Sequence, residues 1–319
     1  MATPPTTAMP MRRLGDLSVS AVGLGCMPLS FSHMRDERPR ALATIHRALD
    51  LGINFLDTSN IYAPSWDAVG HNEELIAEAL NSYQGAADLS SVVVTTKGGI
   101  TRGEGETWGR DSSADALVRA CEASLEALGS TVIDLYQHHR HDPSISYEEQ
   151  MKAVAALRDR GYINRIGISN AQLDEVQVAL DVLGGPDDGG LISVQNEYSP
   201  RYRGESDVLE LCSTLGIAFL PWSPLGGSEQ AKDLGSKFAE FAAVGTEVDA
   251  TAQEVTLAWL LALTPVMIPI PGATRPETID SIVRSAHLVL TADQVDRLSA
   301  TSPMGESMYP EDQPRSPLR

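Results

Sequence analysis

Apolar runs of strand length alternate with helical patterns along nearly the whole chain. After each run, apolar residues recur every three to four positions, which is the spacing of a helix that packs one face against a core. Several of these helical segments end beside a glycine, a common signal for the end of a helix. The eight apolar runs cover residues 21–27, 53–59, 91–97, 132–139, 163–169, 191–198, 217–223 and 266–272.

This alternation predicts parallel strands with helices outside them, and eight such units close into a (β/α)8 TIM barrel, an α/β fold. A doubly wound sheet is the alternative, but it needs a GxGxxG turn after the first strand, which GLGCMPLS lacks. Before the barrel, Gly15 and Asp16 lie between short mixed runs and predict an N-terminal β-hairpin over residues 11–20. Asn72 is expected to cap the helix that follows the second run.

The chain, residues 1–319, is long enough for one large core, and we expect a single (β/α)8 barrel domain with a C-terminal extension. Residues 1–10 and about 303–319 are rich in proline and polar residues, and they are expected to be flexible tails. The C-terminal tail could instead fold over the mouth of the barrel.

The chain carries 24 basic and 43 acidic residues, a formal net charge of −19. Because nucleic acids and anionic membranes attract basic patches, this balance argues against both as partners. The three cysteines are far apart and odd in number, and the first ten residues lack the apolar core of a signal peptide. We therefore expect a cytoplasmic protein without a disulfide framework. The pattern leaves the oligomeric state open.

Polar groups collect where the apolar runs end, and in a parallel barrel this rim carries the active site. Asp57, Lys97 and His139 lie at three strand ends, and Tyr62 follows five residues after Asp57. A phenol has a pKa near ~10, and we expect the Lys97 ammonium, kept charged by Asp57, to lower the pKa of Tyr62. His139 can donate a hydrogen bond to a carbonyl oxygen. Such a set protonates an oxygen while a cofactor delivers hydride to the carbon.

His138, His139 and His141 also suggest a metal site, which is the alternative reading of this stretch. Neighbouring residues of a strand point to opposite faces, so His138 and His139 cannot both face the barrel interior. A metal-dependent barrel hydrolase would also need ligands on the first strand, where only Cys26 is available. We expect no metal.

The sequence resembles the aldo-keto reductase superfamily, and most of all its bacterial and channel-β-subunit-like branch. The motifs that carry this resemblance run in order from about residue 11 to residue 290 and are LDTSNIY, VVTTKGG, IDLYQHHRHDP, GISN, VQNEYSP, FLPWSPLGG and IPIPGATRPE. The resemblance implies that Asp57, Tyr62, Lys97 and His139 form a catalytic tetrad, with Tyr62 as the general acid in reduction.

The resemblance also implies a nicotinamide cofactor. Ser169, Asn170 and Gln195 would hold the carboxamide, and Trp222 would stack on the nicotinamide ring. The other residues that it implies at the cofactor are Ser223, Pro224, Leu225 and Gly226 near the pyrophosphate, and Ile270, Gly272, Ala273, Thr274, Arg275 and Thr278 near the adenosine ribose and any 2′-phosphate.

The chain departs from the family at the 2′-phosphate. Thr278 and Ile282 stand where the family commonly has a basic residue and an asparagine. Arg275 could substitute, because a guanidinium suits phosphate. NADP(H) is therefore the expected cofactor, with NAD(H) as the alternative.

Met27, Phe31, Trp66 and Trp108 fall in loops at the same rim and are the expected substrate contacts. The glycine-rich segment 101–113 could form a mobile lid. The resulting hypothesis is an NADP(H)-dependent reductase that converts an aldehyde or ketone into an alcohol, and sugars, ketosteroid-like rings and small aldehydes all remain possible substrates. The alternatives are an NAD-linked sugar or polyol dehydrogenase on the same site, and a nicotinamide-sensing regulatory subunit.

Overall fold

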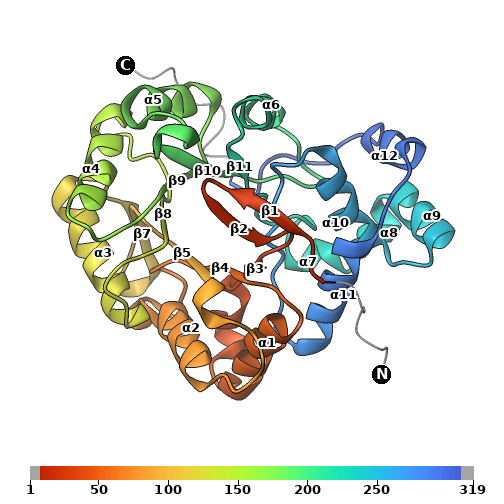
Figure 1. The fold of residues 1–319 in the computed structure, drawn as a ribbon, viewed down its shortest axis with the longest axis horizontal. Helices are drawn as coiled ribbons and strands as arrows, with labels where there is room; N and C mark the ends of the chain where they lie inside the picture. Colours follow the sequence, from red (N-terminus) through yellow and green to blue (C-terminus); the bar gives the residue numbers. More distant parts are fainter. Residues whose placement is uncertain (1–7, 310–319) are drawn as a thin grey trace.

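The centre of the protein is a curled sheet of seven parallel strands in the order β11-β10-β9-β8-β5-β4-β3 (Figure 1). The computed structural model describes residues 8–309. The strands are β3 (Leu24–Gly25), β4 (Phe55–Asp57), β5 (Val93–Gly98), β8 (Leu135–His138), β9 (Ile166–Ser169), β10 (Leu191–Gln195) and β11 (Ala218–Phe219). They correspond to the first seven predicted runs, and the predicted α/β barrel class is confirmed.

Residues 266–272 close the barrel between β11 and β3 as an irregular eighth segment. Single parallel bridges join Met267 to Phe219 and Gly272 to Gly25. On the β3 side, the N–H groups of Gly23 and Gly25 donate to the carbonyls of Pro269 (2.8 Å) and Pro271 (3.0 Å). Pro269 and Pro271 have no N–H to donate in return, so the bonds that their nitrogens would supply are missing from this ladder. The eighth strand therefore lies where it was predicted, but without regular strand pairing.

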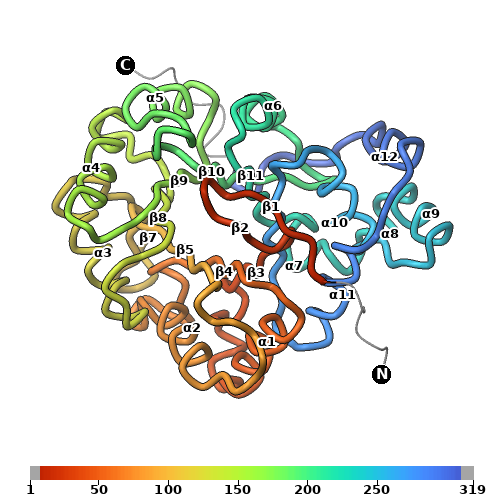
Figure 2. The backbone as a smooth tube through the Cα atoms, viewed as in Figure 1, coloured from red at the N-terminus to blue at the C-terminus, as the bar shows by residue number. Residues whose placement is uncertain are grey.

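Helices surround the sheet, as Figures 1 and 2 show. The helices are α1 (Arg38–Asp50), α2 (His71–Ser82), α3 (Ala114–Leu128), α4 (Tyr147–Asp159), α5 (Leu173–Leu183), α6 (Ser206–Leu215), α7 (Ser228–Ala231), α8 (Leu234–Lys237), α9 (Ala239–Val248), α10 (Ala252–Leu263), α11 (Pro276–His287) and α12 (Ala292–Ser299). Short 3-10 turns occur at η1 (Met27–Ser30), η2 (Ser32–Met34), η3 (Trp66–Ala68), η4 (Leu89–Ser91), η5 (Glu104–Glu106) and η6 (Pro186–Asp188).

The helix ends follow the local sequence chemistry. Ser113 and Thr251 cap α3 and α10 with their side-chain oxygens, and Gly129 ends α3 with a left-handed φ of 62°. The expected cap at Asn72 is wrong, because the N-cap of α2 is Gly70, with a φ of 93°. Asn72 instead accepts a hydrogen bond from the Thr58 hydroxyl at 2.6 Å. It thereby joins α2 to the loop after β4.

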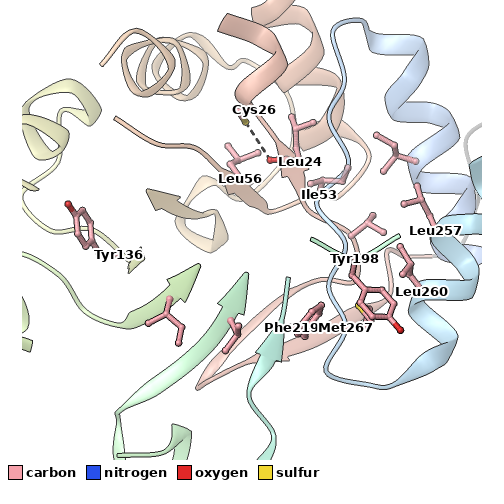
Figure 3. Close-up of a cluster of buried hydrophobic side chains, with 14 of the residues drawn as sticks. Leu24, Cys26, Ile53, Leu56, Tyr136, Tyr198, Phe219, Leu257, Leu260 and Met267 are labelled. Atoms are coloured by element: carbon pink, nitrogen blue, oxygen red, sulfur yellow. Dashed lines mark hydrogen bonds between the residues drawn. The ribbon is translucent and has the colours of Figure 1, made fainter. Parts of the chain in front are cut away.

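Two hydrophobic clusters fill the molecule. The smaller one lies inside the barrel and is closed at the bottom by the predicted hairpin of β1 (Met11–Leu14) and β2 (Leu17–Ser20), whose Leu14 and Val19 are fully buried. The larger one joins the strands to the surrounding helices, and Figure 3 shows part of it, with Phe219 and Met267 near Leu257 and Leu260 of α10. Burial of each such side chain is worth about 1.5–3 kcal/mol.

Residues 101–113 contain a second hairpin, of β6 (Ile100–Gly103) and β7 (Thr107–Arg110), which follows β5 at the rim. The flexible tails expected at residues 1–10 and about 303–319 lie largely outside the described residues. Of the C-terminal tail, residues 303–309 are described. No helix within residues 8–309 is both long and apolar enough to cross a membrane.

Candidate active site

Lys97 is the centre of the polar group at the rim. It lies at the end of β5, with no exposed surface, and its Nζ donates to Asp57 Oδ2 (2.8 Å) and to the carbonyl of Thr58 (2.7 Å). The same Nζ lies 3.4 Å from the Tyr62 hydroxyl. Strands β4 and β5 are hydrogen-bonded neighbours, so their ends bring these groups together.

Asp57 is held by glutamines of two other strands, β8 and β10. Its Oδ1 accepts hydrogen bonds from Gln195 Nε2 (2.7 Å) and Gln137 Nε2 (3.4 Å), and both glutamines are buried. Gln195 is expected at the nicotinamide carboxamide, but here its amide binds the Asp57 carboxylate. Gln137 is absent from the sequence-predicted set. Its position two residues before His139 on the same strand face is the signal that would have found it.

The pKa of Tyr62 is raised, which corrects the expectation that Lys97 lowers it. Burial of the phenol is the largest cause, and the Lys97 charge offsets only part of it. For Lys97, burial opposes the charged form, but Asp57 and Tyr62 outweigh it and the pKa is raised. The pair is therefore a protonated phenol beside an ammonium at neutral pH.

His139 completes the group from β8. Its ring centroid lies 6.0 Å from that of Tyr62, nearly perpendicular to it, and its Nδ1 lies 3.2 Å from the Ser59 hydroxyl. Burial, and then the charge of Lys97, hold the pKa of His139 well below its usual range. The imidazole is thus neutral and able to donate one hydrogen bond.

The neighbouring His138 faces the other way, as strand alternation predicts. Its Nε2 lies 2.9 Å from the Ser112 hydroxyl, and its ring packs against Tyr147 of α4. Within residues 8–309, no group of three or more histidine, cysteine or acidic side chains is placed to bind a metal ion.

Three of the residues expected at the carboxamide and the nicotinamide ring are linked to one another by hydrogen bonds, namely Ser169, Asn170 and Trp222. The Ser169 hydroxyl donates to the carbonyl of Gln195 (2.8 Å), Asn170 Nδ2 donates to the carbonyl of His139 (3.0 Å), and Trp222 Nε1 donates to Asn170 Oδ1 (3.1 Å). Asn170 and Ser223 adopt left-handed φ values of 56° and 47°. Such strain costs about 1–3 kcal/mol per residue and concentrates at ligand sites.

The loop after β11 and the loop after residue 271 carry the remaining expected cofactor residues. Gly226 N–H donates to the carbonyl of Ser223 (2.8 Å), which makes a tight turn that also contains the buried Pro224. Beside this turn is a hollow of about 370 Å³, lined in part by Leu225, Gly226 and Arg201. The hollow has two cationic side chains in its lining, Arg201 and Lys237, and Arg201 forms an ion pair with Glu197 at 3.2 Å.

In the second loop, an added Cβ at Gly272 would lie 2.6 Å from Pro28, so only glycine fits there. Ala273 is buried and Thr274 is half-buried. Arg275 is the N-cap of α11, and its Nε lies 3.3 Å from the Thr278 hydroxyl. Ile270 packs into the cluster inside the barrel. The structure therefore places the Ile270 side chain in the core, whereas the loop residues face the rim.

The expected substrate residues lie on three loops of the rim. Met27, Trp66 and Trp108 are exposed, and Phe31 packs at 5.8 Å against His33. Trp108 covers the guanidinium of Arg102, whose Cζ lies 4.9 Å from the ring centroid. Their contact with a substrate stays a prediction.

The C-terminal segment 303–309 lies across this rim, which is the alternative that the sequence left open for the tail, and its individual contacts were not predicted. Tyr309 packs at 5.6 Å against Trp222, and Arg140 lies over the Tyr309 ring at 4.6 Å. The buried Glu197 carboxylate accepts hydrogen bonds from the Ser307 hydroxyl (2.9 Å) and the Met308 N–H (2.8 Å). Burial raises the pKa of Glu197.

Comparison with known proteins gives consistent matches over nearly the whole chain. A model of the Aldo/keto reductase family matches residues 21–302. An uncharacterised oxidoreductase of Schizosaccharomyces pombe is 31% identical over 289 residues, which are 90% of this chain and 88% of that protein. Pyridoxine 4-dehydrogenase of Escherichia coli is 29% identical over 299 residues, or 91% and 97% of the two chains.

Solved structures share the same fold. An aldo/keto reductase from Klebsiella pneumoniae, in complex with NADP and acetate, superposes with a TM-score of 0.76 at 23% identity, covering 97% of this chain and 98% of that one. The glycerol dehydrogenase of Gluconobacter oxydans gives a TM-score of 0.76 at 22% identity, covering 93% and 98%.

Proposed function

Because the chain belongs to the aldo/keto reductase family, we propose that it reduces a small aldehyde or ketone to the alcohol, with NADPH as hydride donor. The observation that carries this proposal is the position of Lys97, whose ammonium lies between the Asp57 carboxylate and the Tyr62 hydroxyl. A phenol beside a buried ammonium is a proton donor whose anion is stabilised.

NADP(H), when bound, supplies the hydride. Tyr62 gives its proton to the substrate oxygen, and Lys97 stabilises the phenolate that remains. Asp57 and the Thr58 carbonyl keep the lysine charged in a buried site. The neutral His139 donates a hydrogen bond to the same oxygen from Nε2, with Ser59 occupying Nδ1.

The residues at the rim fit a nicotinamide cofactor. Ser169, Asn170 and Trp222 offer polar groups and an aromatic face at the strand ends, and the tight turn at Ser223 and Gly226 would approach a pyrophosphate. Two solved structures of aldo-keto reductase from Klebsiella pneumoniae, with the same fold, contain NADP or NADPH, which supports the same assignment here.

Replacement of Tyr62 by phenylalanine tests the general acid. We expect the turnover number for benzaldehyde, pyridoxal or glyceraldehyde with NADPH to fall by about 10²–10⁴-fold, because proton transfer is lost. The dissociation constant for NADPH, followed by tryptophan fluorescence, should stay the same. Tyr162→Phe is a matched control, because that hydroxyl binds Glu122 on the surface. Undiminished carbonyl reduction by Tyr62→Phe would contradict the proposal.

An NAD-linked alcohol dehydrogenase is the second candidate, and the contact between Arg275 and Thr278 favours it. The threonine offers no positive charge to a 2′-phosphate, so Arg275 alone would have to bind one. Titration with NADPH and NADH distinguishes the two. If Arg275 binds the phosphate, Arg275→Ala should weaken NADPH binding about 10-fold or more and leave NADH binding unchanged. Equal binding of both cofactors by the unchanged protein would favour the dehydrogenase.

We also propose a cytoplasmic location. The three cysteines are buried free thiols, as expected for a reducing compartment. Cell fractionation with an antibody against the chain would test the location.

A further inference from the structure

The β6–β7 hairpin sends one buried side chain toward the loop that carries Tyr62. Arg102 has 9% of its side chain exposed, whereas the residues around the tip of the hairpin, from Glu104 to Gly109, are exposed. Its Nη1 donates to the carbonyl of Ile61 (3.2 Å) and to the carbonyl of Ala63 (2.7 Å). These are the backbone carbonyls on either side of Tyr62.

Tyr62 needs such support because its loop belongs to no strand or helix. Its N–H donates to the carbonyl of Ser59 (3.1 Å), and its carbonyl accepts from the N–H of Asn72 (3.1 Å). Its hydroxyl lies at the far end of a rigid ring, so a small backbone rotation would move it away from Lys97. Arg102 adds two charge-assisted hydrogen bonds at this point, which are stronger than neutral ones.

Arg102 is itself held from two further sides. Its Nε forms an ion pair with Glu106 Oε2 at 2.7 Å, and Trp108, its partner across the hairpin, covers the guanidinium. Glu106 adopts a left-handed φ of 61°, a strained conformation for a residue with a side chain. The second carboxylate oxygen of Glu106, Oε1, accepts a hydrogen bond from the N–H of Trp66 at 3.0 Å. The hairpin thus binds the Tyr62 loop at Ile61, Ala63 and Trp66.

We propose that Arg102 is a positioning residue for Tyr62, and that the β6–β7 hairpin is a fixed part of the catalytic apparatus. Arg102 contacts no reacting atom. It fixes the backbone on both sides of Tyr62 and so sets the distance between the phenol and the Lys97 ammonium. This role rests on the proposed function, in which Tyr62 is the general acid.

Arg102→Ala tests the role. We expect the turnover number of carbonyl reduction with NADPH to fall by about 10²-fold, the typical effect of a displaced catalytic group. The dissociation constant for NADPH should change little, because the expected cofactor residues lie on other loops. The solvent deuterium isotope effect on turnover should rise, since proton transfer becomes slower. If Arg102 only stabilised the fold, turnover, NADPH binding and thermal stability would instead fall together.

Three further measurements make the test specific. Guanidinium chloride at millimolar concentration should restore part of the turnover of Arg102→Ala, because the ion fits the vacated space. Arg102→Lys should recover less than the wild-type rate, since an ammonium lacks the guanidinium fork. The matched control is Arg13→Ala on the β1–β2 hairpin, where Arg13 pairs with Asp187 in solvent. This variant should keep full turnover and show no response to guanidinium.

The outcomes separate the two proposals. Loss of turnover in Tyr62→Phe together with full turnover in Arg102→Ala would overturn the positioning role alone. Full turnover in Tyr62→Phe would overturn the general acid, and the positioning role with it. If Arg102→Ala loses NADPH binding and thermal stability together and does not respond to guanidinium, Arg102 supports only the fold.

Discussion

At Tyr62, burial and the neighbouring ammonium act on the pKa in opposite directions, and burial is the larger. The sequence places a lysine beside a tyrosine but does not say how deeply either is buried. Desolvation depends on everything packed around a group, so it is read only from the folded structure. For reduction the raised pKa is useful, because the phenol must carry its proton at the start.

The pH dependence of reduction follows from these shifts. Turnover needs protonated Tyr62, so it should stay level from neutral pH upward and fall only as pH rises past the ordinary phenol value of about 10. His139 should add no acidic limb near neutrality, because its pKa lies well below its usual range. Initial rates at saturating NADPH measure this profile. A limb between about pH 6 and 7, the ordinary histidine range, would show that His139 titrates there.

Strand-end residues could be located from the sequence, whereas their long-range partners could not. Asp57 and Lys97 close two neighbouring runs, and parallel pairing puts such ends together. Gln195 reaches Asp57 from a position 138 residues further along the chain. That contact depends on closure of the barrel, and no local pattern encodes it.

At the scale of elements, the periodicity of apolar residues predicts the strands and helices that bury an apolar face. The barrel strands and their helices have such faces and lie where they are predicted. The β6–β7 hairpin has almost none, because its inward side chain is Arg102 and its order comes from hydrogen bonds to other loops. Periodicity therefore does not predict this hairpin, and whether segment 101–113 moves as a lid stays a prediction. A similar limit applies at Asn72, where the cap pattern is present but the side chain binds Thr58 instead.

At the scale of the whole molecule, net charge opposes the proposed cofactor, since the protein carries −19 and NADP(H) is an anion. Binding must therefore rely on local groups, namely backbone N–H groups at strand ends and nearby arginines such as Arg201 and Arg275. Added salt screens both long-range repulsion and local attraction. This arrangement favours a cofactor held by short-range contacts.

One junction of the barrel, between residues 266–272 and β3, lacks regular strand pairing. Where Pro269 and Pro271 face β3, the proline nitrogens donate no hydrogen bond, so this part of the ring of strands relies on bonds such as those from the amides of Gly23 and Gly25. In hydrogen exchange, these two amides should lose protection earlier than those shared by β5 and β8, which pair over four residues.

A bound cofactor at the loop of Gly272 would lie next to this junction, because Gly272 packs against Pro28, which follows β3. We therefore expect saturating NADPH to slow exchange at Gly23 and Gly25 more than elsewhere in the sheet, and mass spectrometry of peptides that cover β3 measures the change. Equal protection of every strand would contradict this. If the expectation holds, bound NADPH stabilises the closed barrel as well as taking part in the reaction. The bound protein then opens at this junction less readily than the apo protein.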